Sequence, residues 1–166
     1  GIIFLIFTFY SAYQLRNIAG IKYFLLIVLI CIFTDIGGYI FGKLFKGPKL
    51  TKISPNKTFA GALGGFILAV VISLIYNNYY TSYTIVYGLP FKFIELIKNT
   101  DAIYLIWVLL ISLISQIGDL IISYFKRLAK VKDTGKILPG HGGLLDRIDG
   151  LIFVIPISYL FIYPLT

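Results

Sequence analysis

Long apolar runs without a charged residue constrain the fold of this sequence more than any other feature. The clearest run covers residues 59–76, where no side chain is charged. A helix that crosses a membrane needs about 20 mostly apolar residues, because each residue rises about 1.5 Å through a hydrocarbon layer about 30 Å thick. Charged residues make up only 13% of the chain, against about 25% in soluble domains. The sequence therefore predicts an all-α, polytopic bundle of membrane helices and argues against a water-soluble domain.

About five membrane-spanning segments are expected in the chain. Four runs are long enough and a fifth is partial: residues 21–41, 59–76 (or as far as 80), 102–125 and 151–166, with 2–13 as the remainder of an earlier span. After Pro90, residues 91–98 predict a short helix on the membrane surface. The chain has no methionine and opens directly in an apolar stretch. We therefore expect residues 1–166 to be one domain, the C-terminal part of a longer membrane protein.

Positive charge gathers in two loops, the one after the 21–41 run and the one after the 102–125 run. Together these loops hold eleven of the fifteen basic residues: Lys43, Lys46, Lys49, Lys52, Lys57, Lys126, Arg127, Lys130, Lys132, Lys136 and Arg147. Short loops rich in Lys and Arg stay on the cytoplasmic side of a membrane. Because the charge lies between apolar runs, it favours anionic lipid or a phosphorylated substrate as partner and argues against nucleic acid. The sequence predicts an integral protein of the plasma (inner) membrane, with both loops facing the cytoplasm.

Two carboxylates, Asp35 and Asp119, interrupt the apolar runs. Such a charge costs about 2.5–3.5 kcal/mol at the centre of a span and persists only with a partner or water. At about 100° per residue, Ser123 and Lys126 lie within roughly 40° of Asp119 on a helix, and Arg127 about 80° away. One helix face thus carries a carboxylate, a hydroxyl and two cations. A simple ion pair of Asp119 with Lys126 within the helix is the alternative.

The segment 126–149 combines cations, glycines and carboxylates. In its turn at residues 140–143, Gly-His-Gly-Gly, the glycines let backbone N–H groups approach phosphate oxygens. Asp146 and Asp149, three residues apart at the start of the last span, place two carboxylates where a hard cation can bind. His141 could equally be a turn residue, and Asp149 a helix cap. Taken together, these features indicate metal-assisted phosphoryl or nucleotidyl transfer.

The order of these residues closely resembles the signature of the phosphatidate cytidylyltransferase (CDP-diacylglycerol synthase) family. The matching positions are Ser123, Lys126-Arg127, Lys132-Asp133, Gly135, residues 138–143 and residues 146–149. A second block also resembles the family: residues 35–39, Gly42-Lys43, residues 54–58, Gly61 and Gly64-Gly65. These glycines could instead serve close helix packing, which is compatible with function. Family members often have alanine where Gly38 stands and an acidic residue where Ala60 stands.

The resemblance implies a nucleotidyltransferase of phospholipid biosynthesis, with this chain as its catalytic part. A phosphate oxygen of phosphatidic acid would attack the α-phosphorus of CTP, giving CDP-diacylglycerol and pyrophosphate. The cofactor would be Mg²⁺, with or without a monovalent cation. Whether the protein forms a homodimer is left open by the sequence. The implied catalytic residues are Asp119, Lys126, Arg127 and Asp146, with Asp119 and Asp146 as metal ligands. The implied substrate-binding residues are Ser54, Lys57, Thr58, Ser123, Lys132, His141, Gly142, Gly143 and Arg147.

Some roles and some rival functions stay open at this point. Asp133 and Asp149 could support the metal ligands, and Asp35 could be structural or line a polar cavity. A transporter or channel would use Asp35 and Asp119 to relay ions, but it gives no role to the glycine-histidine turn. A CDP-alcohol phosphotransferase would carry a paired-aspartate helix motif that this sequence lacks. A lipid kinase that uses CTP needs similar phosphate-binding chemistry and remains an alternative.

Overall fold

The computed structural model describes residues 2–51, 54, 57–87, 101–131, 135 and 145–162 of the chain. These residues form four helices: α1 (Ile2–Phe45), α2 (Phe59–Tyr87), α4 (Asp101–Leu128) and α5 (Leu145–Ile162). Within the described ranges the only extended pairing is an isolated bridge between Lys49 and Thr58. The predicted all-α class is confirmed. The predicted surface helix at 91–98 lies outside the described residues.

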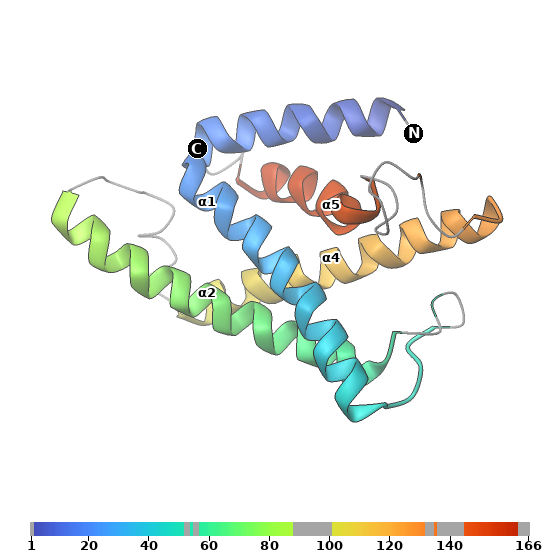
Figure 1. The fold of residues 1–166 in the computed structure, drawn as a ribbon. Coiled ribbons are helices and arrows are strands. Elements are labelled where there is room, and N and C mark those ends of the chain that lie inside the picture. Colours follow the sequence, from blue (N-terminus) through green and yellow to red (C-terminus); the bar gives the residue numbers. More distant parts are fainter. Residues whose placement is uncertain are drawn as a thin grey trace.

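The helices have the length and composition expected of membrane spans. Three long apolar stretches can each cross a bilayer, namely Ile2–Phe45, Phe59–Tyr79 and Ala102–Leu128, and Ile148–Ile162 is a shorter apolar helix. One feature differs from the sequence-based prediction, because the expected 2–13 remnant and the 21–41 run belong to one helix. Gly20 divides that helix with φ 81° and ψ 162°, a conformation open essentially only to glycine. The two arms of α1 run in clearly different directions on either side of this kink (Figure 1), so they are compatible with two separate spans.

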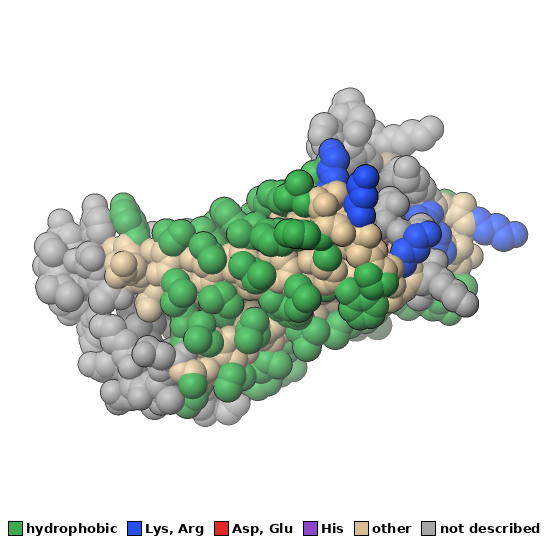
Figure 2. Space-filling model, turned by 90° about the horizontal axis from the view of Figure 1, so that it is seen from below, with side chains coloured by type: hydrophobic (Ala, Val, Ile, Leu, Met, Phe, Trp, Pro, Cys, Tyr) green, Lys and Arg blue, Asp and Glu red, His purple; other side chains and the backbone are tan. Residues whose placement is uncertain are grey.

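The surface of the bundle has an apolar body and a basic end. Large apolar side chains such as Ile67, Leu74 and Ile106 are exposed along the helices, as expected where lipid rather than water surrounds the protein. The Lys and Arg side chains visible in Figure 2 gather at one end of the molecule. At this end α1 and α4 terminate and α2 and α5 begin (Figure 1). The prediction that the two basic loops share one side is therefore confirmed.

Two of the helices stop at this end with a lysine in the left-handed conformation. Lys46 after α1 has φ 42°, and Lys130 after α4 has φ 55°. Backbone hydrogen bonds close the last turn of each helix: Lys46 N donates to Gly42 O at 3.3 Å, and Val131 N, just after Lys130, donates to Lys126 O at 3.0 Å. A left-handed residue at this position is a common helix terminator. It ends both apolar helices where their flanking charges begin.

Glycines bring α1 and α2 into backbone contact near the basic end. A Cβ atom added at Gly37 would lie 2.4 Å from Gly64 O, and one added at Gly61 would lie 2.6 Å from Gly38 O. Small residues allow this kind of approach between membrane helices, where dispersion contacts replace the hydrophobic effect as the driving force. Further along the bundle the core consists of larger side chains, among them Leu15, Ile27, Ile30, Val108 and Val154. The close crossing therefore lies near the charged end of the bundle, where it orients the loop before α2.

Candidate active site

The loop between α1 and α2 carries Lys57 to the surface of α4. Leu50 N donates to Lys57 O at 2.7 Å, and Phe59 N donates to Pro48 O at 3.1 Å, so the two sides of the loop hold each other. Thr58 caps α2, because its Oγ1 accepts a hydrogen bond from Gly61 N at 3.1 Å. The result is a fixed exit from the loop into α2, with Lys57 one residue before the cap.

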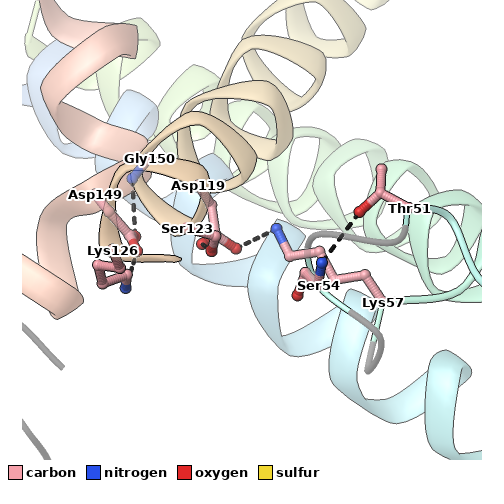
Figure 3. A network of polar contacts seen from close by, with 8 residues as sticks. All are labelled: Thr51, Ser54, Lys57, Asp119, Ser123, Lys126, Asp149 and Gly150. Carbon is pink, nitrogen blue, oxygen red and sulfur yellow. Dashed lines mark hydrogen bonds and ion pairs between the residues drawn. The ribbon is translucent and has the colours of Figure 1, made fainter. Parts of the chain in front are cut away.

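Lys57 forms an ion pair with Asp119. Its Nζ contacts Asp119 Oδ2, and Ser123 Oγ donates to Asp119 Oδ1 at 3.4 Å. Figure 3 shows the Lys57 side chain reaching from its loop to the α4 carboxylate. Ser54, which was predicted to bind substrate, lies beside Lys57. Its backbone N donates a hydrogen bond to Thr51 Oγ1 at 3.3 Å. The two predicted sequence blocks thus meet at Asp119.

A second charged pair joins α4 to α5. Lys126 Nζ lies 3.8 Å from Asp149 Oδ2, and Asp149 Oδ1 accepts a hydrogen bond from Gly150 N at 3.0 Å. Both side chains are largely buried, with 15% and 12% of their surface exposed. The pair lies beside Asp119, with which the Asp149 carboxylate interacts electrostatically (Figure 3). The structure therefore gives Asp119 and Lys126 partners on other elements, in addition to their neighbourhood on one helix face.

Asp35 extends this cluster to α1. Its carboxylate interacts electrostatically with both Asp119 and Lys57. Residues from four elements, α1, the loop before α2, α4 and α5, thus contribute to one charged cluster, defined as Asp35, Lys57, Asp119, Ser123, Lys126 and Asp149. Its carboxylates outnumber its ammonium groups three to two.

The residues present fit a magnesium ion in their donor chemistry. Magnesium prefers oxygen ligands and is usually held by one or two carboxylates, with water and substrate phosphates completing its shell. Asp119 and Asp149 supply neighbouring carboxylate oxygens at the end of the bundle. Among the described residues no group of three or more His, Cys, Asp or Glu side chains could hold a metal by itself. Asp119 and Asp149 would therefore supply only part of the oxygen shell that such an ion needs.

Several predicted site residues do not enter the described cluster. Arg127 lies in the last turn of α4 and is exposed. Asp146 and Arg147 lie in the first turn of α5, one turn before Asp149, and their side chains fall outside the described residues. The others outside the described residues are Lys132, Asp133, His141, Gly142 and Gly143. The predicted metal pair Asp119 and Asp146 therefore stays a prediction, with the two backbones at the same end of the bundle.

Sequence reasoning underrated three residues of this region. Asp149 was expected as a support of the metal ligands, and Asp35 as a structural residue or part of a polar cavity, yet both interact with Asp119. Gln116 was not considered, although its side chain bonds to α2 close to the cluster, with Nε2 3.3 Å from Ala62 O. The signal that could have found it is its spacing: Gln116 lies three residues before Asp119 in a largely apolar run, on the same helix face.

The fold and this cluster define a polytopic helical membrane protein with a charged, phosphate-compatible site at one end of its bundle. Within that class the particular assignment follows from comparison with known proteins. The chain belongs to the cytidylyltransferase family, whose family model matches residues 1–165. The resemblance noted in the sequence is confirmed.

Similar proteins are found among staphylococcal enzymes. The chain is 40% identical over 146 residues to the phosphatidate cytidylyltransferase of Staphylococcus epidermidis strain RP62A. The alignment covers 87% of this chain and 50% of that protein. It is 40% identical over 139 residues to that of Staphylococcus haemolyticus, covering 83% and 48%. It is 39% identical over 151 residues to that of Staphylococcus aureus strain COL, covering 87% and 50%. The chain spans about half the length of the curated relatives it matches.

Proposed function

We propose that the protein carrying this chain is a phosphatidate cytidylyltransferase, which forms CDP-diacylglycerol and pyrophosphate from CTP and phosphatidic acid. The observation that carries the proposal is the charged cluster around Asp119, where an apolar helix meets a cation from a second element and a carboxylate from a third. The family membership and the names of the relatives agree with this chemistry. A site that must join a lipid phosphate to a nucleotide needs both an apolar flank and concentrated charge.

The proposed reaction does not require the protein to transfer a proton. The phosphate of phosphatidic acid is already an anion at neutral pH and can attack without a general base. The difficulty is to bring this anion in line with a triphosphate that repels it. Lys57 and Lys126 are ammonium groups already positioned by carboxylates. We assign them, with Arg127 and Arg147, to hold phosphate oxygens, since fixed cations stabilise the charge that spreads over the transferring group.

The carboxylates are assigned to magnesium. Asp119 would hold the ion together with Asp146, and Asp149 would support them from the next turn of α5. A magnesium ion held by these carboxylates would neutralise phosphate charge on the substrates. Ser123, which donates to Asp119, fixes the carboxylate orientation. Ser54 and Thr58 come from the loop that delivers Lys57, and Lys132, His141, Gly142 and Gly143 are assigned to phosphate by their match to the family pattern.

The placement of the cluster suits a lipid substrate. The helices around it expose apolar side chains, so the acyl chains of phosphatidic acid can remain in the bilayer while the head group reaches the charged end. We infer that this end faces the cytoplasm of the plasma membrane, because basic loops are retained on that side and CTP is supplied there. The lipid then reacts without leaving the membrane.

The test is lipid labelling by the complete protein that contains this chain. Membranes from cells that express it would be supplied with phosphatidic acid and with CTP labelled in its cytosine ring. The lipid product would be identified by thin-layer chromatography. Asp119→Asn and Asp146→Asn are each expected to abolish labelling while the protein still inserts, since an amide is a poor ligand for a hard cation. Asp101→Asn is the matched control, because Asp101 begins the same helix roughly 27 Å from Asp119 along its axis.

Each outcome of this assay bears on one part of the proposal. A cytidine-labelled lipid with Asp101→Asn active and both other variants inactive supports reaction and site together. Near wild-type labelling by both Asp119→Asn and Asp146→Asn would refute the metal assignment. A phosphorylated lipid without cytidine would indicate the lipid kinase instead. Absence of any CTP-dependent product from the complete wild-type protein would refute the function.

A further inference from the structure

A single polar stripe on α4 links all the other described helices. It consists of Ser112, Gln116, Asp119, Ser123 and Lys126, which fall within an arc of roughly 80° at 100° per residue. Each contact of the stripe leads to a different element: Ser112 Oγ lies 2.8 Å from Thr34 Oγ1 on α1, and Lys126 pairs with Asp149 on α5. Most other residues of α4 are apolar; the exceptions include Ser115, exposed Arg127 and Tyr104, whose Oη donates to Ser73 O on α2 at 3.0 Å. The stripe therefore sets how α4 is positioned against its neighbours.

Gln116 is the member of this stripe that contacts α2 itself. Its Nε2 donates to Ala62 O at 3.3 Å, although this carbonyl lies in the first turn of a helix. Gly65 makes room for the amide, because a Cβ atom at that position would lie 3.1 Å from Gln116 Nε2 and 2.9 Å from Thr34 O. Even partial burial of a carboxamide is unfavourable unless the group is hydrogen-bonded. The bond to Ala62 therefore favours one particular position of α2 on α4.

The same two elements also meet at the ion pair of the charged cluster. Lys57 precedes Ala62 by five residues, and Asp119 follows Gln116 by three, so the amide contact and the ion pair are consecutive links between the α2 region and α4. The ion pair is the weaker constraint on geometry. Its side chains are 28% and 24% exposed, and an ammonium on a flexible stem at a wet boundary holds a position poorly. The Gln116 amide is partly buried and lies about one turn further from the charged end of α4 than Asp119.

We infer that Gln116 is a positioning residue for the transfer reaction: by fixing α2 against α4 it places the Lys57 ammonium at the Asp119 carboxylate. The catalytic consequence rests on the proposed function, whereas the placement of Lys57 does not. Without the amide, Tyr104 Oη on α4 still donates to Ser73 O on α2 at 3.0 Å, but this bond lies twelve residues along α4 from Gln116, so it holds the register at the charged end less tightly. Lys57 would then reach Asp119 in only part of the population. Because misplacement by about 1 Å can cost about 100-fold in rate, the effect on turnover should be large.

The first test is a double-mutant cycle in membranes containing the complete protein. Gln116→Leu is expected to lower kcat/KM for CTP about tenfold or more, and to lower it less than about twofold when Lys57→Ala is already present, because the residue acts through Lys57. Ser112→Ala is the matched control. It removes a hydrogen bond between helices one turn away on the same stripe, and its effect should multiply with that of Lys57→Ala. Equal fold losses from Gln116→Leu with and without Lys57 would overturn the inference.

The second test does not depend on activity. With Cys31, the one cysteine of this chain, and any cysteine outside it replaced, the complete protein can receive Lys57→Cys and Asp119→Cys and be treated in membranes with a short bifunctional thiol reagent. Addition of Gln116→Leu should lower the cross-linking rate several-fold, and Ser112→Ala should not. If Gln116→Leu fails to accumulate, Gly65→Ala crowds the same amide and is expected to act in the same direction. An unchanged cross-linking rate in the Gln116 variant, or in the Gly65 variant used in its place, refutes the positioning role, even if the proposed reaction is confirmed.

Discussion

The contact between α1 and α2 can be tested with two neighbouring glycines. An ideal Cβ at Gly37 would lie 2.4 Å from Gly64 O and 2.9 Å from Gly65 Cα, both backbone atoms that cannot rotate away. At Gly38 the nearest atom would be Gly61 O at 3.8 Å, an ordinary contact distance. Gly38→Ala therefore needs no movement, whereas Gly37→Ala requires α1 and α2 to separate by about 1 Å. The space at Gly38 agrees with the alanine that family members often carry there.

The magnitude follows from two opposing effects. Alanine in place of glycine in a helix stabilises it by about 0.5–1 kcal/mol, and both variants receive this gain. Overpacking a tight contact costs about 1–3 kcal/mol, and only Gly37→Ala incurs it. We expect Gly37→Ala to be less stable than Gly38→Ala by about 1–3 kcal/mol. Activity should fall further than stability, because the same contact orients the loop that carries Lys57, and about 1 Å of displacement can cost about 100-fold.

The assay compares the two variants in the complete protein. Thermal unfolding in detergent should place Gly37→Ala several degrees below Gly38→Ala, since about 1 kcal/mol corresponds to about 2–4 °C for chains of 150–250 residues. CTP-dependent lipid labelling in membranes should be close to wild type for Gly38→Ala and strongly reduced for Gly37→Ala. Equal melting temperatures and equal activities would refute the close crossing and the orientation that we derive from it.

Three further changes test the kink and the second ion pair. Gly20→Ala should lower the melting temperature, because the φ of 81° and ψ of 162° cost a residue with a side chain about 1–3 kcal/mol; unaltered melting would contradict the kink. Gly150→Ala should reduce activity, since its Cβ would lie 2.5 Å from Ser115 Oγ. Adding Ser115→Ala removes that contact and should restore part of the activity, but not all of it, because Ser115 O would still lie 3.2 Å from the new Cβ. Lys126→Ala should raise the KM for CTP or phosphatidic acid by removing a phosphate-holding cation and the partner of buried Asp149; unchanged steady-state constants would count against that role.

Much of the architecture was predictable because it depends on local composition. Uncharged runs of about 20 residues specify membrane helices by length alone, and the excess of lysine in two loops places those loops on one side. The glycines of residues 37–65 indicated close helix contact, and the structure confirms it at Gly37 and Gly64. The family resemblance, carried by residues whose spacing is fixed along the chain, was equally visible without coordinates.

The kink of α1 was not predictable from the same signals. Gly20 separates two apolar stretches, and the sequence suggested two segments with a connection between them. The structure keeps the chain helical on both sides and turns it at one residue. A glycine between two apolar stretches is compatible with a straight helix, a kink or a turn. The choice depends on where the two arms find packing partners, which is a property of the whole bundle.

The amino-acid sequence alone determined that this chain enters a membrane as helices, which loops share a side, and which residues resemble a cytidylyltransferase signature. Only the tertiary structure decided the partners inside the charged cluster. Helical periodicity places Lys126 near Asp119, yet the structure also brings Lys57 to Asp119 from another element and seats Lys126 beside Asp149. Periodicity reports neighbours on one helix, whereas contacts between helices depend on where their axes cross, and that crossing is set by the glycines of α1 and α2 and by the amide of Gln116.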